Sequence, residues 1–232
     1  MTTAIILAGG MGTRLRSAVP DLPKPMAPIS GRPFLEHQMD YWIGQGVNRF
    51  VLSVGYKKEL IMDHFGESYQ GIPLNYAIEV EPLGTGGGLL LAAQELREPF
   101  LVLNGDTFFE VELAKLMDFH TGHQSEWSFA LFRTNEVGRY MGMDVKPDGE
   151  IVSLKSGTGQ PGRLANGGVY LLNPAVLAKT KYGQGQKVSL EDDLLPDFVA
   201  QGGKLYGIEC PGSFIDIGVP EDYFRAADVL PH

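Results

Sequence analysis

Cysteine, long hydrophobic runs and basic charge are all scarce in this chain of 232 residues. The one cysteine, Cys210, excludes an internal disulfide and suits a reducing compartment. No stretch approaches the ~20 apolar residues that a membrane-spanning helix needs. The N-terminus also lacks the basic start and long apolar segment of a signal peptide. We therefore expect a cytoplasmic protein.

Basic residues are outnumbered, with 19 lysines and arginines against 28 acidic residues and a formal net charge of −9. Non-specific nucleic-acid binding needs a basic surface, so the composition argues against that class of function, but not against binding of single nucleotides. No Ser-His-Asp or Cys-His arrangement is visible. The five histidines lack metal-ligand spacing and fit surface or core roles: His37, His64, His120, His123 and His232.

A glycine-rich segment near the N-terminus is the most informative feature that is present. Gly9, Gly10 and Gly12 follow a short apolar run, residues 4–7, that predicts a β-strand. Because glycine has no Cβ, the backbone N–H groups of such a loop can approach a phosphate closely. The segment therefore predicts a polyphosphate-binding loop.

The local charge supports this prediction. Residues 1–32 carry four basic residues against one acid, a net charge of +3, so the other 200 residues carry −12. Arg14 offers a fork of donors and Lys24 a compact positive charge, and both suit phosphate oxygens. The alternative is a tight strand–helix turn with solvated basic side chains.

Two better-known glycine loops are excluded. A P-loop requires Lys-Ser or Lys-Thr directly after its last glycine, and neither dipeptide follows here. The dinucleotide-binding fingerprint requires a glycine or alanine three residues after its second glycine, and counting from Gly10 and Gly12 that position is Leu15.

The pattern of apolar residues predicts an α/β fold in one continuous unit, residues 1–232. Strand-like and helix-like runs alternate in the first half, which favours a mixed, mostly parallel central sheet flanked by helices. The second half is richer in β-structure and should form walls over the ligand. The predicted strands are 4–7, 49–54, 74–78, 100–103, 128–133, 143–145, 151–154, 168–172 and 204–208, and the predicted helices are 33–45, 57–65, 86–96, 188–200 and 220–229.

Two aspartates stand out as metal ligands. Asp106 follows the apolar run 101–103, and Asp216 lies inside the apolar run 214–217. A lone acid in such surroundings is costly unless it is paired or metal-bound, and polyphosphate chemistry uses Mg²⁺ held by one or two carboxylates. A shared metal is the favoured interpretation. The alternatives are a turn-capping role for Asp106 and a salt bridge or helix cap for Asp216.

A cluster of acids at 191–193 has a simpler explanation. Ser189 is a typical N-cap residue, and acids in a first helical turn interact favourably with the helix dipole. A solvated helix start accounts for Asp192 and Asp193.

Taken together, these residues resemble the sugar-1-phosphate nucleotidylyltransferases. The signature of that family is similar to 9–15 together with Pro23-Lys24-Pro25-Met26. Further similar tracts follow in the same order over nearly the whole chain: 81–87, Asn104-Gly105-Asp106, 166–170, Asp216-Ile217-Gly218 and 220–223. The resemblance implies a Rossmann-like nucleotidyltransferase fold, with a smaller β-rich part that binds the sugar. It also implies one catalytic domain over 1–232 with no appended β-helix domain.

Within this family, three tracts most resemble the D-glycero-α-D-manno-heptose 1-phosphate guanylyltransferases: 22–29, 53–57 and 104–109. That resemblance implies synthesis of capsule or surface-glycan precursors. Two departures are visible. Residues 16–19 replace a Pro/Thr-containing segment of many members, and Leu154-Lys155-Ser156 stands where many carry Glu-Lys-Pro.

The resemblance implies attack of a sugar 1-phosphate on the α-phosphorus of a nucleoside triphosphate, with loss of pyrophosphate. Arg14 and Lys24 would be catalytic, and Asp106 and Asp216 would hold Mg²⁺ (or Mn²⁺). The nucleotide would contact Leu7, Gly9, Gly10, Gly12, Thr13, Glu79, Gly84 and Thr85. The sugar phosphate would contact Asn104, Gly142, Lys155, Asn166 and Glu191. A homodimer is implied as well.

Glu79 bears on the choice of base. It lies where thymidylyl and uridylyl relatives often carry a glutamine that reads the base. A carboxylate only accepts hydrogen bonds, and guanine offers adjacent donors at N1 and N2, so Glu79 favours GTP. Glu81 is an alternative reader.

Three alternatives stay open. Two are the same chemistry on other substrates, namely mannose 1-phosphate with GTP or N-acetylmuramate 1-phosphate with UTP. The third is a non-catalytic nucleotide-sugar sensor.

Overall fold

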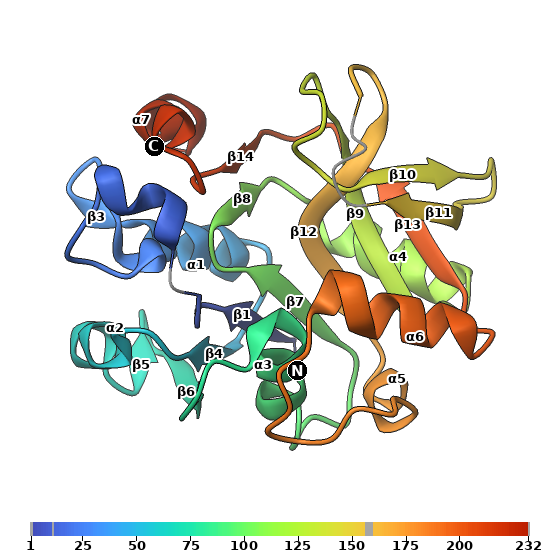
Figure 1. The fold of residues 1–232 in the computed structure, drawn as a ribbon, viewed down its shortest axis with the longest axis horizontal. Coiled ribbons are helices and arrows are strands. Elements are labelled where there is room, and N and C mark those ends of the chain that lie inside the picture. The colour runs from blue at the N-terminus through green and yellow to red at the C-terminus, as the bar shows by residue number, and fades with distance from the viewer. Residues whose placement is uncertain (1, 11, 156–159, 232) are drawn as a thin grey trace.

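The computed structural model describes residues 2–10, 12–155 and 160–231, and in this part of the chain one ten-stranded sheet carries helices on both faces (Figure 1). In the first half, strands and helices alternate as the sequence predicts. The strands are β1 (Thr3–Leu7), β2 (Pro28–Ile29), β3 (Arg32–Pro33), β4 (Arg49–Val54), β5 (Ser68–Tyr69), β6 (Ile72–Ile78), β7 (Phe100–Asn104) and β8 (Thr107–Phe109). The helices are α1 (Phe34–Gly44), α2 (Lys58–Phe65), α3 (Gly84–Ala92) and α4 (Leu113–Gly122), with 3₁₀ turns at Thr13–Ser17 and Lys24–Met26.

The second half supplies six further strands within the described residues. They are β9 (Trp127–Arg133), β10 (Gly142–Val145), β11 (Glu150–Lys155), β12 (Leu164–Leu172), β13 (Leu205–Glu209) and β14 (Phe214–Asp216). The helices are α5 (Ala175–Ala178), α6 (Leu195–Ala200) and α7 (Pro220–Val229), and a π-helical turn at Leu190–Leu194 leads into α6.

The sheet is mixed, with the order β10-β11-β13-β9-β12-β7-β1-β4-β6-β5. Strands β7, β1, β4 and β6 are parallel neighbours, and so are β9 and β13. Strand β12 runs antiparallel to both β7 and β9, and β11 runs antiparallel to β10 and β13. A mostly parallel sheet therefore describes the first half only, because apolar periodicity reports burial and not strand direction.

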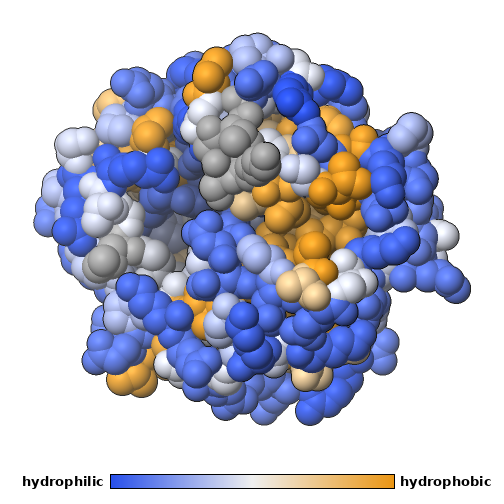
Figure 2. Space-filling model, turned by 45° about the vertical axis from the view of Figure 1, so that its right-hand side comes forward, coloured by the Kyte–Doolittle hydropathy of each residue, from blue (hydrophilic) through white to orange (hydrophobic). Residues whose placement is uncertain are grey.

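Side chains of the buried strands point alternately to the two faces of the sheet and pack into two hydrophobic cores, one on each face. Ala4 and Ile6 of β1 pack on one face with Trp42 of α1, and helices α2 and α4 share this core. Ile5 packs on the other face with Leu89 of α3, together with α5 and α6. A third core joins α7 to the N-terminal 3₁₀ turn and to β8 and β14. Figure 2 shows a hydrophobic hollow on the flank that comes forward from the right-hand side of Figure 1.

The sequence pattern did not predict helices α4 and α5 or the short strands β2, β3, β5, β8 and β14. Helix α4 buries Leu113, Leu116 and His120 at helical spacing, but a histidine occupies one of these three positions and weakens the apolar pattern. The ribbon of β8 and β14 pairs segments about a hundred residues apart, with Ile215 opposite Phe108. Strands this short carry no periodicity of their own, so only their pairing identifies them.

Candidate active site

The glycine loop lies beside the end of β7. Leu7 at the end of β1 is opposite Asn104 at the end of β7 in a parallel pair, and the carboxyl ends of such strands are where ligands of α/β sheets bind. The N–H of Gly105 donates to Leu7 O at 3.1 Å. A Cβ on Gly105 would lie 2.5 Å from Leu7 O, so only glycine permits this approach. Asp106 is thereby fixed next to the loop.

A first cavity of about 360 Å³ opens over the loop. Of the predicted nucleotide-binding residues, it is lined by Leu7, Gly9, Gly10, Gly12, Glu79, Gly84 and Thr85, and Lys24, Asn104 and Asp106 also face it. Sequence reasoning did not assign seven further lining residues: Ala8, Pro25, Ser53, Pro82, Gly88, Gly105 and Lys187.

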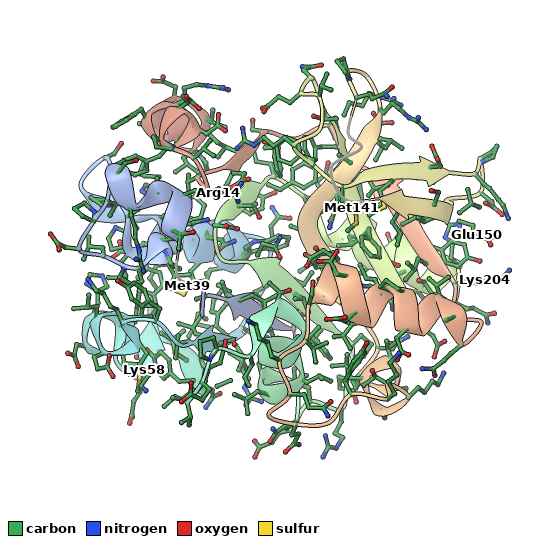
Figure 3. All side chains as sticks on the ribbon, in the orientation of Figure 1. Arg14, Met39, Lys58, Met141, Glu150 and Lys204 are labelled. Carbon is green, nitrogen blue, oxygen red and sulfur yellow. The ribbon has the colours of Figure 1, made fainter. Side chains whose placement is uncertain are left out.

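A second cavity of about 280 Å³ adjoins the first and shares Asn104 and Asp106 with it. Its predicted members are Arg14, Asn166, Glu191 and Asp216. The unpredicted ones are Thr107, Arg139, Tyr140, Met141, Gly168 and Phe214. Arg14 and Met141 come from opposite halves of the fold to line it (Figure 3). Two adjoining cavities with a common wall can hold two reactants in contact.

Lys24 stands at the common wall. Its Nζ lies 2.6 Å from Asp106 Oδ2, and its side chain is only 10% exposed. The neighbouring Pro25 and Met26 are buried, and they anchor the short 3₁₀ turn that carries the lysine. A compact, nearly buried ammonium at this place can stabilise negative charge that develops between the two cavities.

Asp216 is brought to the same place by the ribbon. In the β8–β14 pairing it is opposite Thr107, and the N–H of Ile217 donates to Asp106 O at 2.9 Å. Burial raises the pKa of Asp216, and the negative charge of Asp106 raises it further. Arg139 donates through Nη2 to the backbone oxygen of Asp216 at 3.1 Å, and the same nitrogen lies 3.5 Å from its Oδ2.

These oxygen donors fit a hard divalent cation. Asp106 and Asp216 are brought together, and the buried Oδ1 of Asn104, which lines both cavities, makes no hydrogen bond to the described residues. No cluster of three or more His, Cys, Asp or Glu residues occurs within 2–10, 12–155 and 160–231. This donor set matches Mg²⁺, which is held by one or two carboxylates with phosphate oxygens and water completing its shell.

Glu79 lines the first cavity beside Gly9. It is buried, and its Oε1 accepts from Ser53 Oγ at 3.0 Å while its Oε2 accepts from the N–H of Leu83 at 2.9 Å. A Cβ on Gly9 would overlap this carboxylate. Because each carboxylate oxygen has two lone pairs, one acceptor position per oxygen is left for a ligand.

Glu191 joins the two cavities from the other side. Thr85 Oγ1 of the first cavity donates to Glu191 Oε2 at 3.2 Å and accepts from the N–H of Leu190 at 2.9 Å. Burial raises the pKa of Glu191. The predicted N-cap is confirmed, since Ser189 Oγ accepts from the N–H of Asp192 at 3.0 Å.

Three predicted residues are not placed in either cavity. Thr13 is exposed in its 3₁₀ turn, and Gly142 pairs with Ala165 inside the sheet while its neighbours Tyr140 and Met141 line the second cavity. Lys155 ends β11, but its side chain lies outside the described part of the structure, as does Met11 of the signature. The sequence carries no spacing signal for Met141 or Phe214, because they come from segments distant along the chain and share only the lining of the second cavity.

Known proteins resemble this chain over nearly its whole length. The family described as nucleotidyl transferase matches residues 3–231. The chain is similar to a D-glycero-alpha-D-manno-heptose 1-phosphate guanylyltransferase of Aneurinibacillus thermoaerophilus, with 42% identity covering 99% of this chain and 98% of the relative. A Campylobacter jejuni protein of the same name is 40% identical, over 96% and 97%. The crystal structure of HddC from Yersinia pseudotuberculosis complexed with GMP-PN has 35% identity and a TM-score of 0.85, over 98% and 99%.

Proposed function

The chain belongs to the nucleotidyl transferase family, and we propose that it transfers GMP from GTP to D-glycero-α-D-manno-heptose 1-phosphate, with release of pyrophosphate. The observation that carries the proposal is the pair of adjoining cavities that share Asn104 and Asp106, with Lys24 bonded to Asp106 at their boundary. A transferase of this kind must bring two phosphorylated substrates together at one phosphorus atom.

We assign the triphosphate to the first cavity. The N–H groups around Gly9, Gly10 and Gly12 would cradle its phosphates, and Glu79 and Gly84 would face the base. The sugar phosphate would occupy the second cavity, where Asn104, Asn166 and Glu191 offer polar groups to hydroxyls. Lys155 would bind its phosphate, and Gly142, inside the sheet, would act through its backbone.

The chemistry is a single in-line displacement. A phosphate oxygen of the sugar 1-phosphate forms a bond to the α-phosphorus, and the bond to the bridging oxygen of pyrophosphate breaks. The nucleophile is already an anion, so no general base is required. The residues accelerate the step by positioning and by charge neutralisation. Lys24 would stabilise charge at the α-phosphorus, and Arg14 would stabilise the leaving pyrophosphate.

A divalent cation completes the proposed site. Asp106 and Asp216 would hold Mg²⁺ or Mn²⁺, which when bound neutralises phosphate charge between the reactants. Arg139, bonded to the backbone of Asp216, would keep that carboxylate oriented.

A substrate panel tests the proposal. The purified protein is incubated with Mg²⁺, with GTP, UTP or ATP, and with heptose 1-phosphate, mannose 1-phosphate or N-acetylmuramate 1-phosphate, while pyrophosphate release is measured. The highest kcat/KM is expected for GTP with the heptose. A higher value for mannose 1-phosphate or for UTP would reassign the substrates, and nucleotide binding without product from any pair would favour a sensor.

The cellular context follows from this chemistry. GDP-heptose would serve synthesis of capsule or surface glycans, and GTP is a cytoplasmic nucleotide, so we place the protein in the cytoplasm. No helix within the described residues is long and apolar enough to cross a membrane. One sheet runs through both halves, which supports a single catalytic domain over 1–232. A homodimer stays a prediction for sedimentation equilibrium to check.

A further inference from the structure

The loop at 183–188 lies directly on the N-terminus of α3. Val188 O accepts from the N–H groups of Gly86 and Gly87 at 2.9 and 3.1 Å, and the N–H of Val188 donates to Leu83 O at 2.8 Å. The loop therefore satisfies N–H groups that a helix start otherwise leaves without a partner.

The glycines of α3 make this contact possible. A Cβ on Gly84 would lie 2.7 Å from Val188 O, and a Cβ on Gly87 would lie 2.5 Å from Gln186 O. Both obstacles are backbone atoms, which cannot move aside as the end of a flexible side chain can. The segment 84–88, in which every residue but Thr85 is glycine, is thus shaped to receive the loop.

Seating of the loop places Lys187 at the first cavity. Among the described residues, two lysines at distinct positions line this cavity. Lys24 is bonded to Asp106 at the boundary with the second cavity, whereas Lys187 is exposed and lies next to Val188, which contacts Gly84. The N–H of Leu83 also donates to Glu79, so Lys187 lines the same end of the cavity as Glu79 and Gly84.

Guanine matches a carboxylate and an ammonium at this end. It carries donors at N1 and N2 and acceptors at O6 and N7 on the adjoining edge. Glu79 can only accept hydrogen bonds, and Lys187 can only donate them. Adenine places an amino donor where guanine has O6, so a lysine there has no acceptor at that position.

We propose that Lys187 is a specificity-determining residue that donates to O6 of guanine while Glu79 accepts from N1 and N2. This inference rests on the proposed function and deepens it. The loop contact with α3 fixes the lysine backbone, and the ammonium selects guanine by hydrogen-bond polarity.

The test is nucleotide binding without sugar phosphate. Displacement of a fluorescent GDP analogue by GTP, ITP, ATP and UTP is measured for the wild type, Lys187→Met and Lys181→Met. ITP retains O6 and N7 but lacks the N2 amine. Lys181 is a matched control because it loses the same charge close by in sequence, pairs with Asp197 at 3.2 Å and does not line the cavity.

Lys187→Met is expected to weaken GTP and ITP equally, by about ten- to a hundredfold, as for loss of a charge-assisted hydrogen bond. It should leave ATP and UTP nearly unchanged, and Lys181→Met should match the wild type. An equal loss for all four nucleotides would assign Lys187 to phosphate or ribose and overturn the proposal, as would no loss for GTP. A different result would refute the proposed function alone: GTP binds selectively, but pyrophosphate is released with none of the sugar phosphates.

Discussion

Gly84→Ala tests how the nucleotide cavity is built. Gly84 has φ +72°, in the left-handed region, and a Cβ there would lie 2.7 Å from Val188 O. Gly31 has φ +81° but no atom within 4 Å of its Cβ position. Gly31→Ala therefore measures backbone strain alone, and Gly84→Ala adds displacement of the loop 183–188.

The magnitudes can be separated. A left-handed alanine costs about 1–2 kcal/mol, which is the whole expected loss for Gly31→Ala. Displacing the loop weakens three backbone hydrogen bonds of Val188, each worth about 0.5–1.5 kcal/mol. Gly84→Ala should therefore reduce the free energy of unfolding by about 3 kcal/mol or more.

Urea unfolding followed by tryptophan fluorescence measures both losses, because Trp42 and Trp127 are buried. GTP affinity is measured alongside. It should fall for Gly84→Ala, since the loop carries Lys187, and stay unchanged for Gly31→Ala. Equal destabilisation by the two substitutions, with equal GTP affinity, would refute the account of the loop contact.

Four further predictions follow from the site and the fold. Arg14→Ala should reduce kcat about a hundredfold or more with an unchanged circular dichroism spectrum, and near-normal turnover would reject its role. Glu79→Gln should lower the GTP/UTP ratio of kcat/KM, and an unchanged ratio would count against base reading. Chelation by EDTA should abolish turnover, and added Mg²⁺ should restore it. Asp216→Asn should need at least about tenfold more Mg²⁺ than the wild type for half-maximal activity. An equal Mg²⁺ requirement in the two proteins would show that Asp216 is not a metal ligand. Burial lowers the pKa of His120 below 6.5, so the stabilising contribution of the neutral imidazole is complete above pH 6.5 and is lost as pH falls through the folded-state pKa. His120→Gln should therefore flatten the decline of the free energy of unfolding between about pH 7.5 and 5. Equal slopes of the free energy of unfolding against pH in the wild type and the variant would contradict this.

Much of the fold was predictable because local patterns agree with the tertiary structure. The apolar run of β4 and the periodicity of α7 give the observed bounds, 49–54 and 220–229. Helix α3 was predicted at 86–96 and is found at 84–92, because its start is set by contact with the loop at Val188 and not by its own residues.

The residues of the candidate site likewise fall into those that could be assigned from the sequence and those that could not. Gly9, Lys24 and Asp106 could be assigned from sequence because polyphosphate chemistry demands these residue types near strand ends. Met141, Phe214 and Lys187 could not, since a methionine, a phenylalanine or a lysine in a loop is ordinary on its own. Their place in the two cavities comes from neighbours distant along the chain.

The sequence alone determined the kind of chemistry: a glycine loop with cationic side chains, two isolated aspartates and an alternating α/β pattern. Tertiary structure decided which groups meet, and pairing of β8 with β14 brings Asp216 to Asp106 across about 110 residues. Residue type and spacing encode burial and local hydrogen bonding. Contacts between residues so far apart depend on strand direction and register, and one local sequence pattern is compatible with more than one direction and register.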